Sequence, residues 1–168
     1  MKTPDFALRP WFETDLDNVV KYANNPNISN NHTNMFPYPY ARADAEKFYA
    51  HVSKAEPANI LAIVNNNEFI GSIGLHFQGD IFFRNAEMGY WIAEPFWGRG
   101  IATAAIQQMV DYGFRTFEIT RIFARPFGSN IGSQRALEKA GFVLEARLAG
   151  TICKNGRIED ELIYAVRK

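Results

Sequence analysis

The chain has 168 residues, and its 18 lysines and arginines balance 18 aspartates and glutamates, so the formal net charge at pH 7 is zero. Because no basic run or cationic amphipathic stretch is present, the sequence lacks the electrostatic footprint of a protein that binds nucleic acid or a membrane surface. The length suits a single domain over residues 1–168, and one cysteine, Cys153, cannot form an internal disulfide.

Targeting and metal-binding signals are absent from the sequence pattern. The segment 1–5 has no apolar signal core, and no apolar run approaches the roughly 20 residues that span a bilayer. The histidines, the cysteine and the carboxylates show no metal-ligand spacing. We therefore expect a cytoplasmic protein without a metal ion.

The N-terminal third predicts two helices separated by a loop. Pro10 marks the first extended segment as an edge strand, and helical spacing follows at Leu16, Val19 and Ala23. The segment 26–41 is rich in asparagine, proline and aromatic residues, which favours an irregular loop. The expected elements are a strand over 6–11, a helix over 15–23, the loop over 26–41 and a helix over 42–56.

The middle of the chain changes to a strand pattern. Two β-rich segments, 60–64 and 69–77, are separated by an asparagine-rich turn at 65–68, which predicts a hairpin. A third strand over 86–92 follows the turn near Gly79. These strands predict an antiparallel meander.

The C-terminal half alternates between the helical pattern and the strand pattern. The expected elements are a helix over 99–117, a strand over 119–127, a helix over 132–140 that ends at Gly141, and strands over 142–148 and 162–166. The whole order predicts an α+β domain, with one central, mixed but mostly antiparallel sheet of six to seven strands flanked by about four helices.

The segment Trp97–Thr103, with the sequence Trp-Gly-Arg-Gly-Ile-Ala-Thr, is the strongest functional signal. Gly98 and Gly100 directly precede an apolar helix, whose first backbone N–H groups have no partner within the helix. These groups and the helix dipole bind anions, and glycine lets a phosphate approach the backbone closely. The segment therefore predicts a phosphate cradle, although two glycines before a helix can also mark only a tight turn.

Two common nucleotide sites do not fit this segment. A P-loop requires Gly-Lys-Ser/Thr at the start of the helix, but Gly100 is followed by Ile101 and Ala102. A dinucleotide fold requires a third glycine where Thr103 stands. A second short helix follows thirty residues later, from Asn130 to the glycine at 141, and together the two segments suggest an enzyme that binds acyl-coenzyme A.

The chain resembles the GNAT superfamily of N-acetyltransferases, in particular the branch typified by the ribosomal-protein N-terminal acetyltransferases RimJ and RimL. The resemblance is nearly full length, and Trp97 replaces the glutamine or arginine that usually begins the superfamily's glycine motif. It rests on Leu8-Arg9-Pro10, Ala86–Ile92, Trp97–Thr103, Asn130-x-x-Ser133 with Leu137–Phe142, and Asn155-Gly156-Arg157 with Asp160 and Tyr164.

The resemblance implies acetyl-CoA as the cofactor and assigns the residues that bind it. Backbone N–H groups of the glycine loop would hold the pyrophosphate, and the end of the strand before it would pair with the pantetheine arm. An N–H near Ile92 would stabilise the oxyanion. The implied cofactor-binding residues are Trp91, Ile92, Trp97, Gly98, Arg99, Gly100, Ile101, Ala102, Thr103, Asn130 and Ser133.

Two residues are implied to be catalytic. Ser133 would protonate the coenzyme A thiolate, because the position where many superfamily members have a tyrosine is Leu137 here; the alternative is that Asn130 and Ser133 only cap a helix. Glu87, in an otherwise apolar run, would act as the base through a water molecule, or would make a structural hydrogen bond. His76 is the second candidate for the base, whereas His32 and His51 have no supporting context.

The expected function is acetyl transfer to a primary amine, and the expected acceptor is the α-amine of a protein or peptide N-terminus. Deprotonating a lysine ε-amine at pH 7 costs about 3–4 kcal/mol more than deprotonating an α-amine, so a single carboxylate base suits the α-amine better. The alternatives are a small amine, such as a polyamine, amino acid or aminoglycoside, and a non-catalytic module that binds acyl-CoA. Contact of the loop Met35–Tyr40 with the acceptor is expected, and the chain would be a monomer or a homodimer.

Overall fold

The computed structural model describes residues 5–168, and their seven strands form one sheet in the order β1-β2-β3-β4-β5-β7-β6. β4 pairs with β5 in parallel, whereas the pairs β1–β2, β2–β3, β5–β7 and β6–β7 are antiparallel. The prediction of a mixed, mostly antiparallel sheet is therefore confirmed. The strands are β1 (Ala7–Arg9), β2 (Ile60–Asn65), β3 (Glu68–Phe77), β4 (Asn85–Ile92), β5 (Arg121–Ala124), β6 (Val143–Lys154) and β7 (Arg157–Arg167).

Five α-helices and three short 3-10 helices accompany the sheet within residues 5–168. The α-helices are α1 (Leu16–Ala23), α2 (Pro26–Ser29), α3 (Arg42–Val52), α4 (Ile101–Thr116) and α5 (Ile131–Lys139). The 3-10 helices are η1 (Glu13–Asp15), η2 (Asp80–Phe82) and η3 (Glu94–Phe96). None of the helices within 5–168 is long and apolar enough to cross a bilayer.

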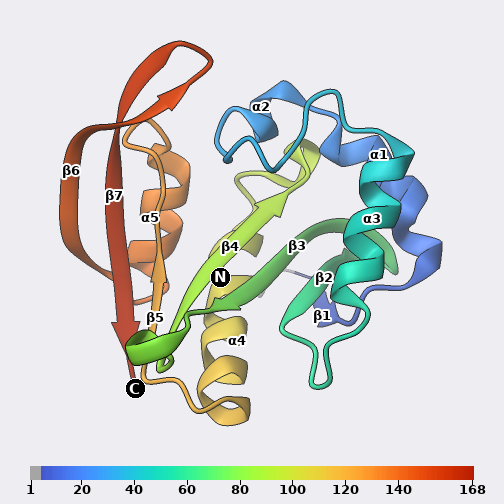
Figure 1. Ribbon diagram of the computed structural model, residues 1–168. Coiled ribbons are helices and arrows are strands. Elements are labelled where there is room, and N and C mark those ends of the chain that lie inside the picture. Colours follow the sequence, from blue (N-terminus) through green and yellow to red (C-terminus); the bar gives the residue numbers. More distant parts are fainter. Residues whose placement is uncertain (1–4) are drawn as a thin grey trace. The chain divides into compact units, whose positions relative to one another are not determined.

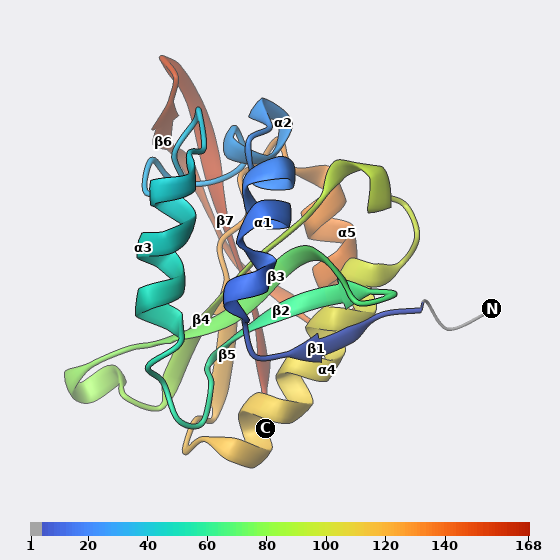
Figure 2. The ribbon, with the colours of Figure 1, turned by 90° about the vertical axis from the view of Figure 1, so that its right-hand side faces the viewer.

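The contacts divide the described residues into two compact units, the first comprising residues 5–74 and 90–105 and the second 75–89 and 106–168. In the first unit, α1 and α3 lie side by side (Figures 1 and 2). Their buried side chains form one core with residues of the strands. This core contains Trp11, Leu16, Val19, Ala23, Ile28, Tyr40, Ala45, Val52, Ile60, Ala62, Val64, Phe69 and Trp91.

The hairpin of β2 and β3 has the predicted turn. Asn66 and Asn67 both adopt positive φ, of 48° and 66°, which asparagine tolerates better than most residues. The first five residues of β2, Ile60–Val64, are all buried, so this strand is covered on both faces. Gly71 on β3 allows a close approach to β4, because a Cβ at that position would lie 2.3 Å from the Trp91 carbonyl oxygen.

The second unit contains a long hairpin of β6 and β7 at the C-terminal end of the chain (Figure 1). The sequence pattern predicted two shorter strands, 142–148 and 162–166. The longer pairing follows from the turn at Asn155 and Gly156, both with positive φ, which joins the strands directly. β6 remains paired on one side only and most of its residues are exposed.

Three further predictions need correction at their boundaries. The loop over 26–41 begins with a short helix, α2, because Pro26 stands at its first turn and the Asn25 side chain caps it by accepting a 2.9 Å hydrogen bond from the Asn27 N–H. The helix predicted over 42–56 ends at Val52, and the strand predicted over 119–127 covers only Arg121–Ala124.

Candidate active site

The glycine loop between η3 and α4 lies in the first unit. Gly98 and Gly100 have φ of 74° and 77°, a left-handed backbone that residues with a side chain rarely adopt. A Cβ built at either position meets no heavy atom within 4 Å, so the loop borders open space. The residues from Trp97 to Gly100 are all exposed. The loop therefore has the conformation and the access that a phosphate cradle requires.

The helix that follows the loop supplies N–H donors. α4 begins at Ile101, directly after Gly100, and the Ala104 N–H donates to the Gly100 carbonyl at 3.2 Å. The N–H groups of Ile101, Ala102 and Thr103 therefore precede the first hydrogen bond of this helix. They stand at the positive end of a sixteen-residue helix, where an anion is stabilised. These residues fit a pyrophosphate, which is the group that the sequence analysis expected them to bind.

The end of β4 carries the residues proposed to contact the thioester. The Ala93 N–H donates to the Ile70 carbonyl at 2.7 Å, so this residue faces β3. Because successive residues of a strand direct their backbone groups to opposite edges, the N–H of Ile92 points away from β3. The Trp97 indole donates to the Ile92 carbonyl at 2.7 Å, which ties the glycine loop to the strand end.

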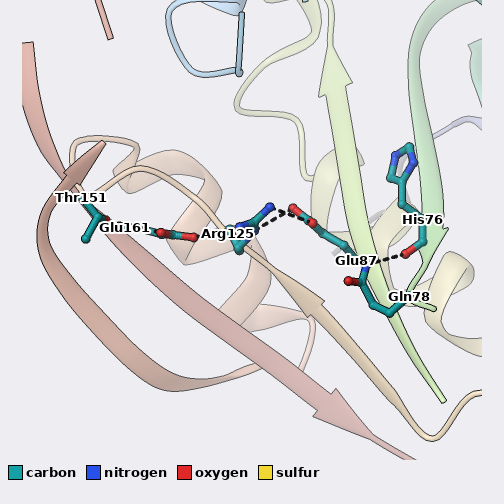
Figure 3. Close-up of polar contacts among 6 residues, drawn as sticks. All are labelled: His76, Gln78, Glu87, Arg125, Thr151 and Glu161. Carbon is teal, nitrogen blue, oxygen red and sulfur yellow. Dashed lines mark hydrogen bonds and ion pairs between the residues drawn. The ribbon is translucent and has the colours of Figure 1, made fainter. Parts of the chain in front are cut away.

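Glu87 on β4, in the second unit, forms an ion pair that the sequence did not predict. The Arg125 guanidinium donates from Nε to Oε1 and from Nη2 to Oε2 of Glu87, both at 3.0 Å, and the Glu87 side chain is 27% exposed (Figure 3). This hydrogen bond raises the pKa of Arg125 above its ordinary value. The sequence suggested apolar surroundings for Glu87, but its carboxylate lies against a charged guanidinium group.

Arg125 also joins Glu87 to the long hairpin. Its Nη1 donates to Oε1 of Glu161 on β7 at 3.3 Å, and the Thr151 hydroxyl donates to the other oxygen of Glu161 at 3.3 Å. One guanidinium thus bridges two carboxylates, and the three groups carry a formal charge of −1. Arg125 directly follows β5, which is parallel to the strand that carries Glu87. A basic residue at this strand end was the sequence signal that could have indicated the ion pair.

His76, the second candidate for the base, lies on β3. Its ring lies against Gly89, where a built Cβ would be 3.5 Å from Nε2, and Figure 3 shows the ring directed away from the Glu87 carboxylate. The His76 backbone carbonyl accepts a 3.2 Å hydrogen bond from the Gln78 side chain. The ring therefore does not form a pair with Glu87.

Asn130 and Ser133 meet at the start of α5. The Asn130 Oδ1 accepts a 3.1 Å hydrogen bond from the Ser133 N–H, so Asn130 is the N-cap of the helix. This cap uses the backbone N–H of Ser133 and not its side chain. Leu137, at the position where many superfamily members have a tyrosine, is fully buried.

Two buried tyrosines elsewhere remain protonated at neutral pH. Burial raises the pKa of Tyr40 to about 12 and that of Tyr164 to about 12. The Tyr164 hydroxyl donates to Glu138 at 2.8 Å, which favours a structural role for this residue in the sheet. Among the described residues, no group of three or more histidine, cysteine or carboxylate side chains is arranged to hold a metal ion.

The family follows from a match to a model described as an acetyltransferase (GNAT) domain, which covers residues 5–143. The chain belongs to the GNAT acetyltransferase family. Its relative YdaF of Bacillus subtilis, named a putative ribosomal N-acetyltransferase, is 33% identical over 106 residues, which are 63% of this chain and 57% of YdaF. The chain thus matches less than two thirds of the length of this curated relative.

Solved structures of GNAT enzymes share the fold over nearly the whole chain. RimL, an α-N-acetyltransferase of ribosomal protein L7/L12 solved with coenzyme A, has a TM-score of 0.85 at 20% identity and covers 98% of this chain and 95% of its own. Spermidine N-acetyltransferase from Vibrio cholerae, solved with CoA and spermine, has a TM-score of 0.80 at 25% identity, with 97% and 95% covered. The GNAT fold, with resemblance to ribosomal-protein acetyltransferases, is confirmed.

Proposed function

We propose that this chain is an acetyl-CoA-dependent N-acetyltransferase whose acceptor is a primary amine, specifically the α-amine of a protein or peptide N-terminus. The observation that carries the proposal is the glycine loop, because two left-handed glycines open onto the N-terminus of α4 in an exposed segment. This arrangement suits a bound pyrophosphate, and coenzyme A contains one. When bound, acetyl-CoA supplies an acetyl group activated as a thioester.

The first unit would hold this group along the loop and the end of β4. Backbone N–H groups of residues 98–103 bind the pyrophosphate, and Arg99 contributes positive charge beside them. Trp91 and Ile92 contact the pantetheine arm, and Trp97 fixes the loop against the strand through its bond to the Ile92 carbonyl. The Ile92 N–H, which points away from β3, stabilises the negative charge that develops on the carbonyl oxygen.

Polar side chains on β4 and at the start of α5 would move the protons. Asn130 starts α5 and binds the pantetheine arm, and the Ser133 hydroxyl gives a proton to the departing thiolate. Glu87 acts as a base through a water molecule. An ionised carboxylate has about four lone-pair sites, and Arg125 uses two, so the remaining sites can accept a hydrogen bond from that water.

The acceptor preference is supported by the amine chemistry and by the relatives. An α-amine loses its proton at lower pH than a lysine side chain does, so the single proposed base suits it. RimL acts on an α-amine by its printed description, and a relative in Escherichia coli is named a ribosomal-protein-serine acetyltransferase. A spermidine acetyltransferase is also among the structural neighbours, so a polyamine is the necessary comparison substrate.

The release of free coenzyme A thiol from acetyl-CoA tests this proposal. The acceptors would be a peptide with a free N-terminus and no lysine, the same peptide with a blocked N-terminus, and spermidine. We expect release with the free peptide and none above background with the blocked one. Release with spermidine but with neither peptide would assign the enzyme to small amines. If none of the three acceptors caused release, only acyl-CoA binding would be left.

A further inference from the structure

The carboxylate of Glu94 on η3 binds the start of α2. The Asn25 side-chain amide donates to Glu94 Oε2 at 2.6 Å, and the Asn27 amide nitrogen lies 3.1 Å from each of the two carboxylate oxygens. These hydrogen bonds, first the one from Asn25, lower the pKa of Glu94, so the group is ionised at neutral pH. Hydrogen bonds to an ionised acceptor are roughly twice as strong as those between neutral groups. Glu94 therefore joins two segments that are 67 to 69 positions apart in the sequence.

Asn25 uses both ends of its side-chain amide. Its Oδ1 accepts a 2.9 Å hydrogen bond from the Asn27 N–H as the N-cap of α2, while its Nδ2 donates to Glu94. A rotated amide would direct its N–H groups at the Asn27 N–H and its oxygen at the carboxylate, and both contacts would be lost. The cap of α2 and the contact with Glu94 therefore fix one another.

The segment that begins at this contact is closed at its other end. The Asn24 Oδ1 accepts a 3.0 Å hydrogen bond from the Tyr40 N–H, so these two residues stand at the base of one loop. Within the loop, Phe36 contacts Trp91 of β4 with ring centroids 5.9 Å apart. We call residues 24–40 the acceptor segment, because they include the loop expected to contact the acceptor. The carboxylate contact thus lies at the base of the acceptor segment.

The backbone of Glu94 contacts the glycine loop. Its carbonyl oxygen accepts a 3.0 Å hydrogen bond from the Trp97 N–H, and the Trp97 indole donates to the Ile92 carbonyl. The Arg99 guanidinium lies 5.1 Å from the centre of the Phe96 ring on the same 3-10 helix. One residue therefore contacts the acceptor segment through its side chain and the proposed cofactor loop through its main chain.

We propose that Glu94 is a positioning residue, which fixes the acceptor segment relative to the end of β4 so that the acceptor amine meets the thioester. This inference rests on the proposed acetyltransferase function. Attack on a thioester requires the amine nitrogen about 3–3.5 Å from the carbonyl carbon, and a displacement of roughly 1 Å slows a reaction by up to about 100-fold. Glu94 acts on the acceptor only through Asn25 and Asn27.

Exchanging the hydrogen-bond donor and acceptor tests this contact. Asn25→Asp keeps a good N-cap but sets a second carboxylate against Glu94, and the two like charges repel. In the double variant Asn25→Asp/Glu94→Gln, the introduced glutamine amide donates to the introduced aspartate, so the contact is restored in the opposite sense. We expect kcat/KM for the acceptor peptide to fall about 100-fold in Asn25→Asp and to return to within about threefold of the wild type in the double variant.

Two further variants separate positioning from stability. Asn25→Ser also keeps an N-cap but lacks the amide, so it should lose about tenfold in kcat/KM, and it replaces Asn25→Asp if that variant does not fold. Glu68→Gln is the control and should match the wild type, because Glu68 also accepts a 2.6 Å hydrogen bond but its donor, the Tyr22 hydroxyl, lies outside the acceptor segment. The thermal shift with acetyl-CoA should be the same in every variant, since each keeps the backbone of the glycine loop.

An active wild type whose kcat/KM is matched by Asn25→Asp would overturn the positioning role, and so would a double variant no faster than Asn25→Asp. Loss of the acetyl-CoA shift in Asn25→Asp would also overturn it, because the contact would then be structural.

Calorimetry of the same peptide with the coenzyme A-loaded proteins separates these results from a failure of the proposed function. The wild type could bind the peptide without transferring an acetyl group. If Asn25→Asp then loses that affinity and the double variant regains it, the positioning role stands and the acetyltransferase activity is refuted. A wild type that neither transfers the acetyl group nor binds the peptide would refute both.

Discussion

The Arg125 guanidinium donates one hydrogen bond of 3.0 Å to each carboxylate oxygen of Glu87. A paired contact of this kind fixes the orientation of the carboxylate as well as its charge. Arg125 also reaches Glu161, so the position of Glu87 depends on β7 as well as on β4. The proposed base is thus an oriented anion that works through a bound water, and this assignment has measurable consequences.

Glu87→Gln should lower kcat about 100-fold, because general base catalysis typically contributes 10²–10⁴. Glutamine keeps the shape of the side chain but cannot accept a proton. Steady-state rates of thiol release, measured across pH, provide the test. Glu145→Gln is the matched control, because Arg121 and Arg167 pair with Glu145 and its side chain is 24% exposed. Similar rates in both variants would remove Glu87 from the mechanism.

Gly100→Ala should weaken acetyl-CoA binding and lower stability. A Cβ at this position meets no neighbour, so the cost arises from the left-handed backbone, about 1–2 kcal/mol. That cost corresponds to a fall of roughly 2–8 °C in melting temperature for a chain of this size. Thermal unfolding with and without acetyl-CoA measures both effects.

Gly79→Ala is the control for this loop variant. A Cβ at position 79 also meets nothing within 4 Å, but its φ of −103° suits any residue. Its melting temperature and its acetyl-CoA shift should both equal those of the wild type. A Gly100→Ala protein that binds acetyl-CoA as well as Gly79→Ala does would exclude the loop as the cradle.

Asn130→Ala and Ser133→Ala should separate helix capping from proton transfer. The Asn130 side chain caps α5, so its removal should cost about 0.5–2 kcal/mol of stability. Only the backbone N–H of Ser133 takes part in that cap, so Ser133→Ala should keep the cap while kcat falls. Urea unfolding and initial rates on the same samples distinguish the two effects. An unchanged kcat in Ser133→Ala would make Ser133 a structural residue only.

Asp160→Asn should reduce stability at neutral pH but not in acid. A hydrogen bond from the Gly150 N–H and the Arg147 guanidinium lower the pKa of Asp160 in the folded state. A lowered folded pKa means that the stabilisation is present above the unfolded value of about 3.9 and disappears as pH falls through the folded value. The urea midpoints of wild type and variant should therefore differ at pH 7 and converge at about pH 2. A difference that persists in acid would contradict this ion pair.

Much of the fold could be predicted from the sequence because the local signals agreed with the tertiary structure. The asparagine turn at 65–68, the helix after Gly100 and the strand ending at Ile92 all depend on local patterns of turn residues and apolar spacing. The strands predicted over 142–148 and 162–166 lie in β6 and β7 but were predicted too short, and exposed β6 has little apolar alternation. Its Asn155-Gly156 turn was the better signal.

The polar contacts of the candidate site could not be predicted in the same way. Glu87 and Arg125 are 38 positions apart, and their pairing depends on the parallel register of β4 and β5. His32 meets the Tyr90 carbonyl across 58 positions, and the aromatic loop gave no local sign of it. The indole of Trp97 holds the glycine loop by donating a hydrogen bond to the Ile92 carbonyl, and the sequence motif does not specify this contact.

The most direct test of the central claim uses one peptide that carries both a free α-amine and a lysine side chain. The protein is incubated with this peptide and acetyl-CoA at pH 7, and fragment mass spectrometry locates the acetyl group. We predict acetylation of the α-amine, at least tenfold faster than that of the lysine, since the α-amine has the lower pKa. Acetylation of the lysine alone, or no acetylation under conditions in which spermidine is modified, would contradict N-terminal acetyl transfer.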